Sequence, residues 1–474
     1  MIFLRNHDEF KMELMRRKSE VDKRRHRRAR MLTQGVCAAL CLCLVLSFLL
    51  PGAVSPDTPT EPIIDNPTLS TSPSHATAPS DPTGIRLDNT QTVNLLSGFI
   101  PKDTQGRPTD EAFTAAQMDF ALKLLQGSYD GENTLVSPLS AALALSILAN
   151  GAGGETLAQI EDVLFGGIPV DDWNEYLKYY VNLLPTTDKV KLHQANSIWY
   201  SESPSLSLRP SFLQTVTDYY NSELYAAPFN DATKNEINDW ISRNTDGLIE
   251  NALNELDGVM CLINALVFDG NWETPYNESN IFDRPFHNAD GGTEIVDMMI
   301  RYENLYLESD TARGFMKAYD GGNYAFVAIL PNEDLTLTEY LETLTVENLT
   351  ELLNSPRHTK VQAGLPQFEY EYGFYLDDTL QDLGITDAFD PTRADFSSMA
   401  DDLYVSSVLQ KTRIIVDAKG TKAAATTIVT MAPTSAPAPD SIKPVILDRP
   451  FLYMIVDTQT NLPIFLGTIT DLGG

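Results

Sequence analysis

The chain has 474 residues, 43% of them hydrophobic, which is enough for two average domains or one large domain with a sizeable core. Its formal net charge of −31 argues against a nucleic-acid partner. The four cysteines indicate neither a disulfide framework nor a metal site, and Cys261 is expected to be a buried small hydrophobic residue.

The first 92 residues form three segments of different composition. Residues 1–34 are basic, and residues 35–54 form an uncharged apolar stretch. About twenty helical residues span roughly one bilayer core, and the preceding cations favour a cytoplasmic N-terminus with the rest of the chain extracellular. We expect an uncleaved signal-anchor in a cell membrane, with a cleaved signal peptide and a secreted protein as the alternative. Residues 55–92, rich in Pro, Ser and Thr, are expected to form an extended linker.

Residues 93–474 have the composition and hydrophobic pattern of a folded domain, with predicted helices mainly in the first half and strands in the second. Apolar residues at helical spacing predict helices at Asp110–Gln126, at Pro138–Ala149 with Ser137 as N-cap, from Glu155 onward, and at Ala232–Arg243. Apolar runs predict strands at Leu192–Trp199, Val259–Phe268, Ala325–Leu330, Val361–Pro366, Val405–Val416, Phe451–Asp457 and Leu462–Thr468. This order is typical of an α+β fold.

Motifs of enzymatic chemistry are missing from the sequence. It contains no nucleophile elbow, zinc-protease helix, P-loop or dinucleotide fingerprint, and the glycine-rich Gly151–Thr156 is interpreted as a helix–helix turn. Carboxylate pairs such as Asp377–Asp378 are interpreted as solvated surface. A hydrolase with a scattered catalytic set is the remaining enzymatic alternative. We expect no enzyme, no cofactor and no metal site.

The stretch Lys419–Pro439 is unusual because Lys422 is its only charge between Gly420 and Ala438. As a strand it would present one uncharged face, since side chains alternate between the two sides of a strand. Such a face could enter an existing sheet without burying a charge or overfilling the core. The stretch is therefore either a linker or a loop able to become a strand. The face consists of Thr421, Ala423, Ala425, Thr427, Val429 and Met431.

Several ordered blocks identify the family that the chain resembles. They are Asn133–Ser140, Gly151–Gln159, Ile237–Ile249, Ile263–Tyr276, Leu383–Met399, Lys419–Thr427 and Asp448–Ile469. From about residue 93 to 474 the chain resembles a serpin (serine protease inhibitor), of a membrane-tethered prokaryotic type. The resemblance implies three β-sheets, about nine helices and an exposed reactive loop near the C-terminus. A target protease cleaves this loop and forms an acyl-enzyme, and the cut loop then inserts into the central sheet.

The resemblance also assigns roles to single residues. Gln410 stands where the family usually has a histidine, and Ala418 where it usually has an acidic residue. Trp272 corresponds to the residue at the end of the central sheet where insertion begins. The loop's hinge lies within Ala418–Thr427 and comprises Gly420, Thr421, Ala423, Ala424, Ala425, Thr426 and Thr427. The shutter beneath the opening sheet comprises Ser137, Ser140, Asn264 and Gln410.

The resemblance also places the reactive bond. Counting the family's usual loop length from Gly420 gives Thr434–Ser435, with Ser435–Ala436 next and Met431–Ala432 third, whereas counting back from Pro450–Phe451 points several residues later. No Lys or Arg lies between Lys422 and Lys443, so the expected target is an elastase-like or subtilisin-like serine protease, bound covalently by a monomeric inhibitor. The alternative is a non-inhibitory serpin that acts as a surface-tethered binding module.

Overall fold

The computed structural model describes residues 91–202, 206–250, 252–253, 255–421 and 442–473. Residues 1–34, 35–54 and nearly all of the predicted linker lie outside this set. Contacts divide the chain into Met1–Ser80 and Asp81–Gly474, and only the second unit contains described residues. Within the described ranges, no helix has both the length and the hydropathy required to span a bilayer.

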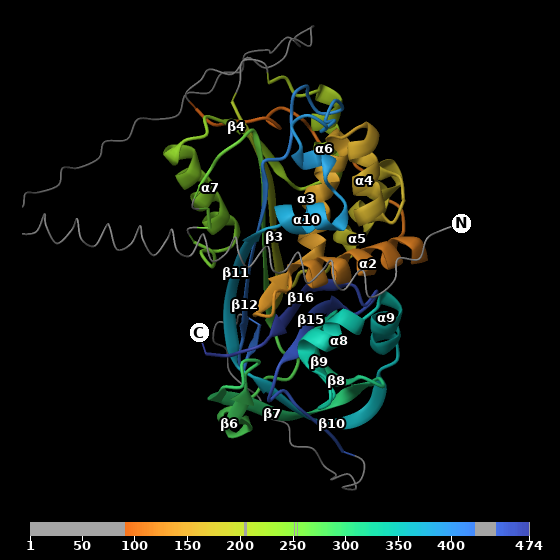
Figure 1. The fold of residues 1–474 in the computed structure, drawn as a ribbon, viewed down its shortest axis with the longest axis vertical. Helices are drawn as coiled ribbons and strands as arrows, with labels where there is room; N and C mark the ends of the chain where they lie inside the picture. The colour runs from red at the N-terminus through yellow and green to blue at the C-terminus, as the bar shows by residue number, and fades with distance from the viewer. Residues whose placement is uncertain (1–90, 203–205, 251, 254, 422–441, 474) are drawn as a thin grey trace, which may run out of the picture. The chain divides into compact units, whose positions relative to one another are not determined.

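The described part of the chain contains nine α-helices, in agreement with the expected number (Figure 1). They are α2 (Glu111–Ser128), α3 (Pro138–Gly151), α4 (Gly154–Phe165), α5 (Val170–Leu183), α6 (Pro210–Tyr219), α7 (Asp231–Asn244), α8 (Leu337–Thr343), α9 (Val346–Asn354) and α10 (Asp377–Leu383). Short 3-10 turns lie at η1 (Glu278–Asn280) and η2 (Asp387–Phe389).

Seven strands form the central sheet, called sheet A below. Its strand order is β1-β4-β3-β5-β13-β12-β11, so strands distant in sequence are neighbours. Two residues of β13 separate β5 from β12 at one end of the sheet, while these two long strands pair directly over the rest of their contact. The strands are β1 (Val93–Asn94), β3 (Val190–Ser201), β4 (Glu223–Ala227), β5 (Met260–Asn271), β11 (Phe368–Tyr375), β12 (Ser407–Val416) and β13 (Gly420–Thr421).

The other described strands form one nine-stranded sheet, called sheet B, where two smaller sheets were expected. The strand β7 joins them, because its 16 residues pair with β6 and β10 along their length and with β8 at the last four residues. The order is β14-β10-β7-β8-β9-β15-β16-β2, with β6 beside β7. The strands are β2 (Thr134–Val136), β6 (Ile281–His287), β7 (Thr293–Glu308), β8 (Ala312–Ala318), β9 (Tyr324–Pro331), β10 (Arg357–Pro366), β14 (Lys443–Ile446), β15 (Phe451–Asp457) and β16 (Pro463–Ile469).

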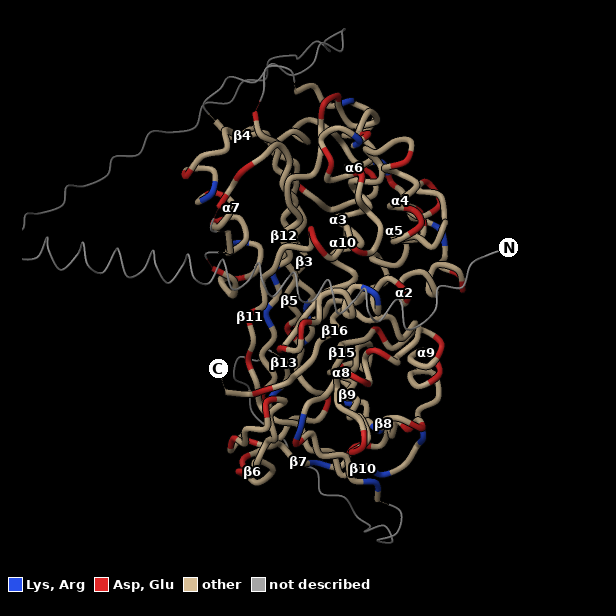
Figure 2. The backbone as a smooth tube through the Cα atoms, viewed as in Figure 1, with Lys and Arg blue, Asp and Glu red and all other residues tan. Residues whose placement is uncertain are grey.

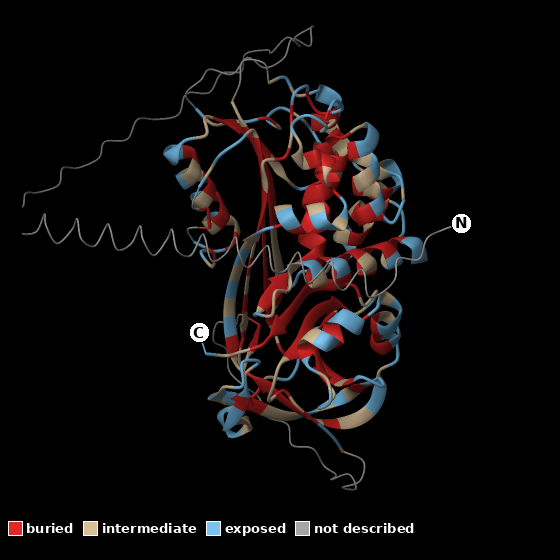
Figure 3. Cartoon of the chain, viewed as in Figure 1, coloured by how far each residue is buried: buried red, intermediate tan, exposed pale blue. Residues whose placement is uncertain are grey.

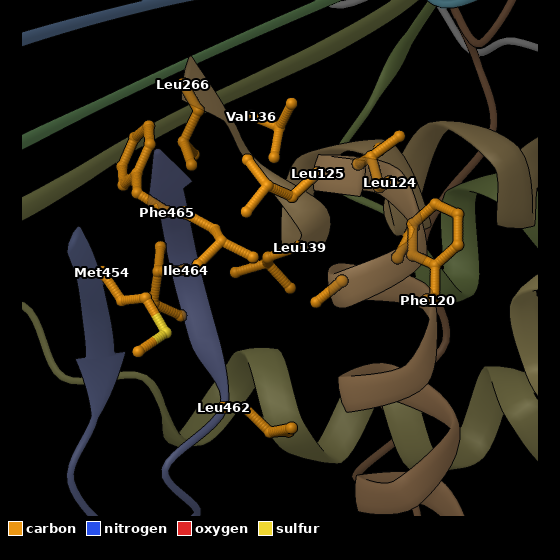
Figure 4. Packing of buried hydrophobic residues seen from close by; sticks show 14 of the residues in the cluster. Phe120, Leu124, Leu125, Val136, Leu139, Leu266, Met454, Leu462, Ile464 and Phe465 are labelled. Carbon is orange, nitrogen blue, oxygen red and sulfur yellow. The ribbon is translucent and has the colours of Figure 1, made fainter. Parts of the chain in front are cut away.

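The helix α3 lies at the centre of the core, in contact with β3, β5 and β16. It is apolar around nearly its whole circumference, the pattern of a fully buried helix. Its start follows the predicted chemistry, since the Ser137 side chain accepts from the Ser140 N–H and Pro138 occupies the first turn. Figure 4 shows Leu139 of α3 among side chains from α2, β2, β15 and β16.

The inner strands of sheet A, β3 and β5, are buried on both faces, whereas the edge strand β11 has one exposed face (Figure 3). Leu262 and Leu266 of β5 join the main core, whereas Ile263 and Val267 pack in a smaller cluster with α7. Ile237, Trp240 and Ile241 face inward from α7, as predicted, and they are at most 3% exposed. Cys261 belongs to the same cluster and is buried, also as predicted. Acidic residues are scattered along the helices α4, α5 and α9 (Figure 2).

Candidate functional site

The start of the predicted hinge is already seated in sheet A. Gly420 pairs with Asn271 and Thr421 with Gly270 on one side, and Thr421 pairs with Val416 on the other. All of these pairings are antiparallel, so β13 is a two-residue wedge between β5 and β12. The next residue, 422, lies outside the described residues.

Gly420 is required for close approach of two backbones. A Cβ atom at this position would lie 2.0 Å from the carbonyl oxygen of Gly270, closer than any side-chain carbon can come. The glycine predicted to supply backbone freedom therefore has a steric role in this arrangement. A turn before it is closed by Asp417, whose side chain accepts from the backbone N–H groups of Lys419 and Gly420 at 2.7 and 3.0 Å.

Thr421 is fully buried and its hydroxyl lies 2.6 Å from the hydroxyl of Tyr319. The Tyr319 ring stacks on Trp272, with ring centroids 4.5 Å apart. A buried hydroxyl needs such a partner, because an unpaired one loses the hydrogen bonds that water would make. The first inserted side chain is thus matched to its site.

Trp272 and Tyr276 fix the backbone that leads into β13. The Trp272 ring nitrogen donates to the Asp417 carbonyl at 2.9 Å, and its backbone N–H donates to the Lys419 carbonyl at 2.8 Å. The backbone N–H of Tyr276 donates to the Ala418 carbonyl, also at 2.8 Å. Three consecutive carbonyls are therefore held by two aromatic residues, and Trp272 follows β5 at the point where β13 meets it.

The four predicted shutter residues lie together where β5 and β12 pair, and each is fully buried. The Gln410 amide bonds both backbone groups of Ser137: its Oε1 accepts from the N–H at 3.0 Å and its Nε2 donates to the C=O at 3.0 Å. The same Nε2 lies 3.4 Å from Asn264 Oδ1. Asn264 Nδ2 donates in turn to the Ser140 carbonyl. An amide thus connects β12, α3 and β5 at the position of the family's usual histidine.

Asn196 is a member of this network that the sequence reading missed. It lies on β3 directly opposite Asn264, and its Oδ1 accepts from Asn264 Nδ2 at 2.6 Å. A buried asparagine inside a strand is a usable signal, since such a group requires partners. The Ser140 hydroxyl and Asn196 Nδ2 have no hydrogen-bond partner among the described residues.

Several predicted residues cannot be placed. The hinge residues Ala423 to Thr427, and Met431, Thr434, Ser435 and Ala436 of the predicted reactive bonds, all lie outside the described residues. Within the described part, the histidines His193, His287 and His358 lie on three different strands, β3, β6 and β10. Gly151–Thr156 forms the predicted turn between α3 and α4.

Comparison with known proteins identifies the family. The family model described as Serpin (serine protease inhibitor) matches residues 115–472, and the chain belongs to this family. Plasminogen activator inhibitor 1 of Bos taurus is 30% identical over 374 residues, which cover 74% of this chain and 91% of that protein. Alpha-1-antiproteinase 2 of Equus caballus is 31% identical over 379 residues, covering 77% of this chain and 88% of the relative.

Solved structures distinguish two states of one relative. The thermophilic serpin tengpin in its native state matches with a TM-score of 0.78 and 42% identity, over 81% of this chain and all of tengpin. Tengpin in its latent state matches with a TM-score of 0.68 and 40% identity, over 79% of this chain. The arrangement of the present chain is therefore more similar to the native state.

Proposed function

We propose that this serpin is a suicide-substrate inhibitor of a serine protease. The protease serine oxygen adds to the Thr434 carbonyl carbon, the Thr434–Ser435 peptide bond breaks, and the Ser435 amine leaves with a proton from the protease's general acid. The inhibitor stays attached through an ester at Thr434. The freed loop then extends β13 between β5 and β12. The observation that carries this proposal is the wedge of Gly420 and Thr421, already paired on both sides.

The pairing of Thr421 sets the register for the rest of the inserted strand. Thr421 lies opposite Gly270 and Val416. Because both pairings are antiparallel, six residues forward in the loop correspond to six residues back along β5 and β12. Thr427 would therefore lie opposite Asn264 and Gln410. Asn264 and Gln410 are themselves paired in the parallel β5–β12 ladder. Insertion would thus separate these two amides and place a threonine hydroxyl between them. A polar residue would replace a polar contact in the buried shutter.

The same register matches the other inward side chains by size and polarity. Small Ala423 would meet Phe268 and Ile414, and Val429 would meet Leu262 and Val408. Large groups are thus opposed by small ones, and apolar groups by apolar ones, as close packing requires. On the opposite face, Lys422 would meet Asp269. This agreement over two strands favours a loop adapted for insertion.

The energy of such an insertion is large enough to disturb a bound protease. About a dozen new residues, each gaining ~1 kcal/mol net per hydrogen bond, give on the order of 10 kcal/mol. This is comparable with the ~5–15 kcal/mol that stabilises a typical folded protein. The chain itself supplies no catalysis in this scheme, because the target provides the nucleophile and the general acid.

The target class follows from the side chain at the reactive bond. Threonine is small, and no Lys or Arg occurs between Lys422 and Lys443 to occupy the acidic pocket of a trypsin-like enzyme. We therefore propose an elastase-like or subtilisin-like target. Mass spectrometry of the fragment released by such a protease tests the bond. We expect a cut at Thr434–Ser435, and a cut outside Met431–Ala438 would refute the assignment.

We also propose that residues 35–54 tether the serpin domain to the outer face of a cell membrane. The support is the composition of these residues and of the basic segment before them. The full chain should sediment with membranes and be digested by protease added outside intact cells. A chain starting at residue 93 should remain in the supernatant. Recovery of the full chain in the supernatant would contradict the tether.

A further inference from the structure

Lys317 on β8 is a cation enclosed beneath the hinge. Its side chain is 1% exposed, and its Nζ lies 2.7 Å from Glu303 Oε1 on β7. The same nitrogen donates to the Thr274 carbonyl at 3.0 Å. It also lies 4.5 Å from the centroid of the Tyr276 ring and 5.3 Å from that of Trp272. An ammonium taken out of water is costly unless such partners replace its hydration.

The two rings beside Lys317 belong to the residues that hold the hinge backbone. Trp272 and Tyr276 donate to the carbonyls of Asp417, Ala418 and Lys419. The Tyr276 hydroxyl is buried and has no hydrogen-bond partner in the described part of the chain. The position of this ring therefore depends on packing and on its cation, since cation–aromatic attraction is strongest where water is excluded.

The described hinge residues, 418–421, contribute no charge to this cluster. Ala418 occupies the position where an acidic side chain is usual, and it packs as a half-buried apolar residue. The carboxylate that balances Lys317 comes instead from Glu303, which is only 15% exposed. A buried ion pair is weak evidence for stability alone, because apolar residues of similar volume often serve as well. Its position beneath the hinge suggests a role in holding the hinge.

We propose that Lys317 is a positioning residue for the reactive loop. Through its contacts with Trp272 and Tyr276 it keeps β13 seated in sheet A, ready for insertion. The effect on protease trapping rests on the proposed inhibitory function. The effect on the seating of β13 does not, because amide hydrogen exchange measures it directly. Loss of Lys317 would free the carbonyls of residues 417–419, let β13 leave the sheet and slow insertion. More acyl-enzyme would then hydrolyse before the protease is trapped.

Two variants break the cluster from opposite sides. Lys317→Met keeps an apolar stem of similar length without the cation, and Glu303→Gln removes the carboxylate charge with little change of shape. In both we expect amide hydrogen exchange at Trp272 and Tyr276 to accelerate about tenfold, since the opening that exposes these two N–H groups becomes easier. In both, the fraction of inhibitor cleaved without trapping protease should rise at least about twofold, because the acyl-enzyme partitions between hydrolysis and insertion.

Leu349→Ala is the control for a general loss of stability, because Leu349 is fully buried in α9 and its truncation opens a cavity on a helix that carries no member of the Lys317 cluster. It should leave the exchange of the Trp272 and Tyr276 amides unchanged. Unchanged exchange in both cluster variants, or equal acceleration in the control, would overturn the role of Lys317. If Lys317→Met does not fold, Glu303→Gln decides. If the wild-type chain traps no protease, the proposed function fails, while the exchange result still decides whether Lys317 holds the hinge.

Discussion

Gln410 gives the centre of sheet A an amide that bonds both an N–H and a C=O of Ser137. Asn264 and Gln410 are the same two residues that the β13 register would separate on insertion. The amide pair therefore lies on the path of the strand, and it carries no group that titrates near neutral pH. The hydrogen bonds that this amide pair makes between β5 and β12 should therefore not depend on pH in the range where a histidine titrates.

Removing this amide should weaken the intact protein. Gln410→Ala leaves the buried N–H and C=O of Ser137 without these partners, so we expect a loss of ~1–3 kcal/mol of stability. The measurement is the midpoint of thermal unfolding. Gln105→Ala, which truncates an exposed glutamine, is the control and should change stability by less than about 0.5 kcal/mol. Equal midpoints for the two variants would show that the Gln410 contacts contribute nothing.

Asp377 was interpreted as part of a solvated carboxylate pair, and that interpretation is wrong. Its side chain accepts from the Val408 N–H at 2.7 Å and is partly buried at the first turn of α10. Burial raises the pKa of Asp377 to about 6; the Val408 N–H opposes this rise and the nearby Asp378 charge adds to it. A shifted pKa of this kind links stability to pH.

The sign of that dependence is fixed by the direction of the shift. Because the folded-state pKa lies above the ordinary value of 3.8, the folded protein favours the protonated Asp377 carboxyl. This favourable contribution to stability is complete only below pH 3.8. The contribution is lost as pH rises through about 6. Asp377→Asn should therefore gain melting temperature over the wild type as pH rises from about 4 to about 7.5. The exposed Asp378→Asn is the control. A pH-independent difference between Asp377→Asn and wild type would contradict the assignment.

At the scale of elements, the short strand β13 links the sequence pattern to the proposed mechanism. Its second residue is fully buried opposite Tyr319, in a space that fits a threonine. Thr421→Arg would place a charge there, so we expect inhibition to fall and the protein to be cleaved as a substrate. Thr421→Val, which keeps the branched shape, should still inhibit. The ratio of inhibitor consumed per protease inactivated measures both, and an unchanged ratio for Thr421→Arg would refute insertion at this site.

The elements that the sequence predicted well are those whose patterns reflect burial. The strand Phe451–Asp457 has the predicted bounds, and α3 begins at Pro138 after the predicted Ser137 cap. The helices α5, α6, α8, α9 and α10 and the strands β4, β6, β7, β8, β11 and β14 were missed. In β11 the exposed face carries Glu369, Glu371 and Gly373, and β-propensity is weak evidence at such an edge strand. Short helices of 7 or 9 residues give too few turns for a clear period.

The candidate site likewise contains residues that the sequence identified and residues that it missed. Ser137, Ser140, Asn264, Gln410 and Trp272 were assigned through family resemblance, and the structure brings the first four together and places Trp272 beside β13. Asn196, Lys317 and Tyr319 were missed, because their roles depend on contacts between residues far apart in the sequence. A lysine in a strand gives no local sign that it will be buried between two aromatic rings.

In the domain as a whole, sheet A already contains the first two residues of the strand that we propose it accepts, Gly420 and Thr421. The chain is more similar to native tengpin, at a TM-score of 0.78, than to latent tengpin, at 0.68. Thyroxine-binding globulin in complex with thyroxine shares the fold at 23% identity. What favours inhibition here is the match between the loop's alternating side chains and the strands that would receive them.

The central claim is that cleavage traps the protease, and titration against a subtilisin-like and an elastase-like enzyme tests it. The products are separated by denaturing gel electrophoresis in detergent. We expect a covalent complex whose mass is that of the protease plus the chain up to Thr434, with loss of protease activity. Cleavage of the loop with the protease left free and active, and no such complex with either enzyme, would contradict it.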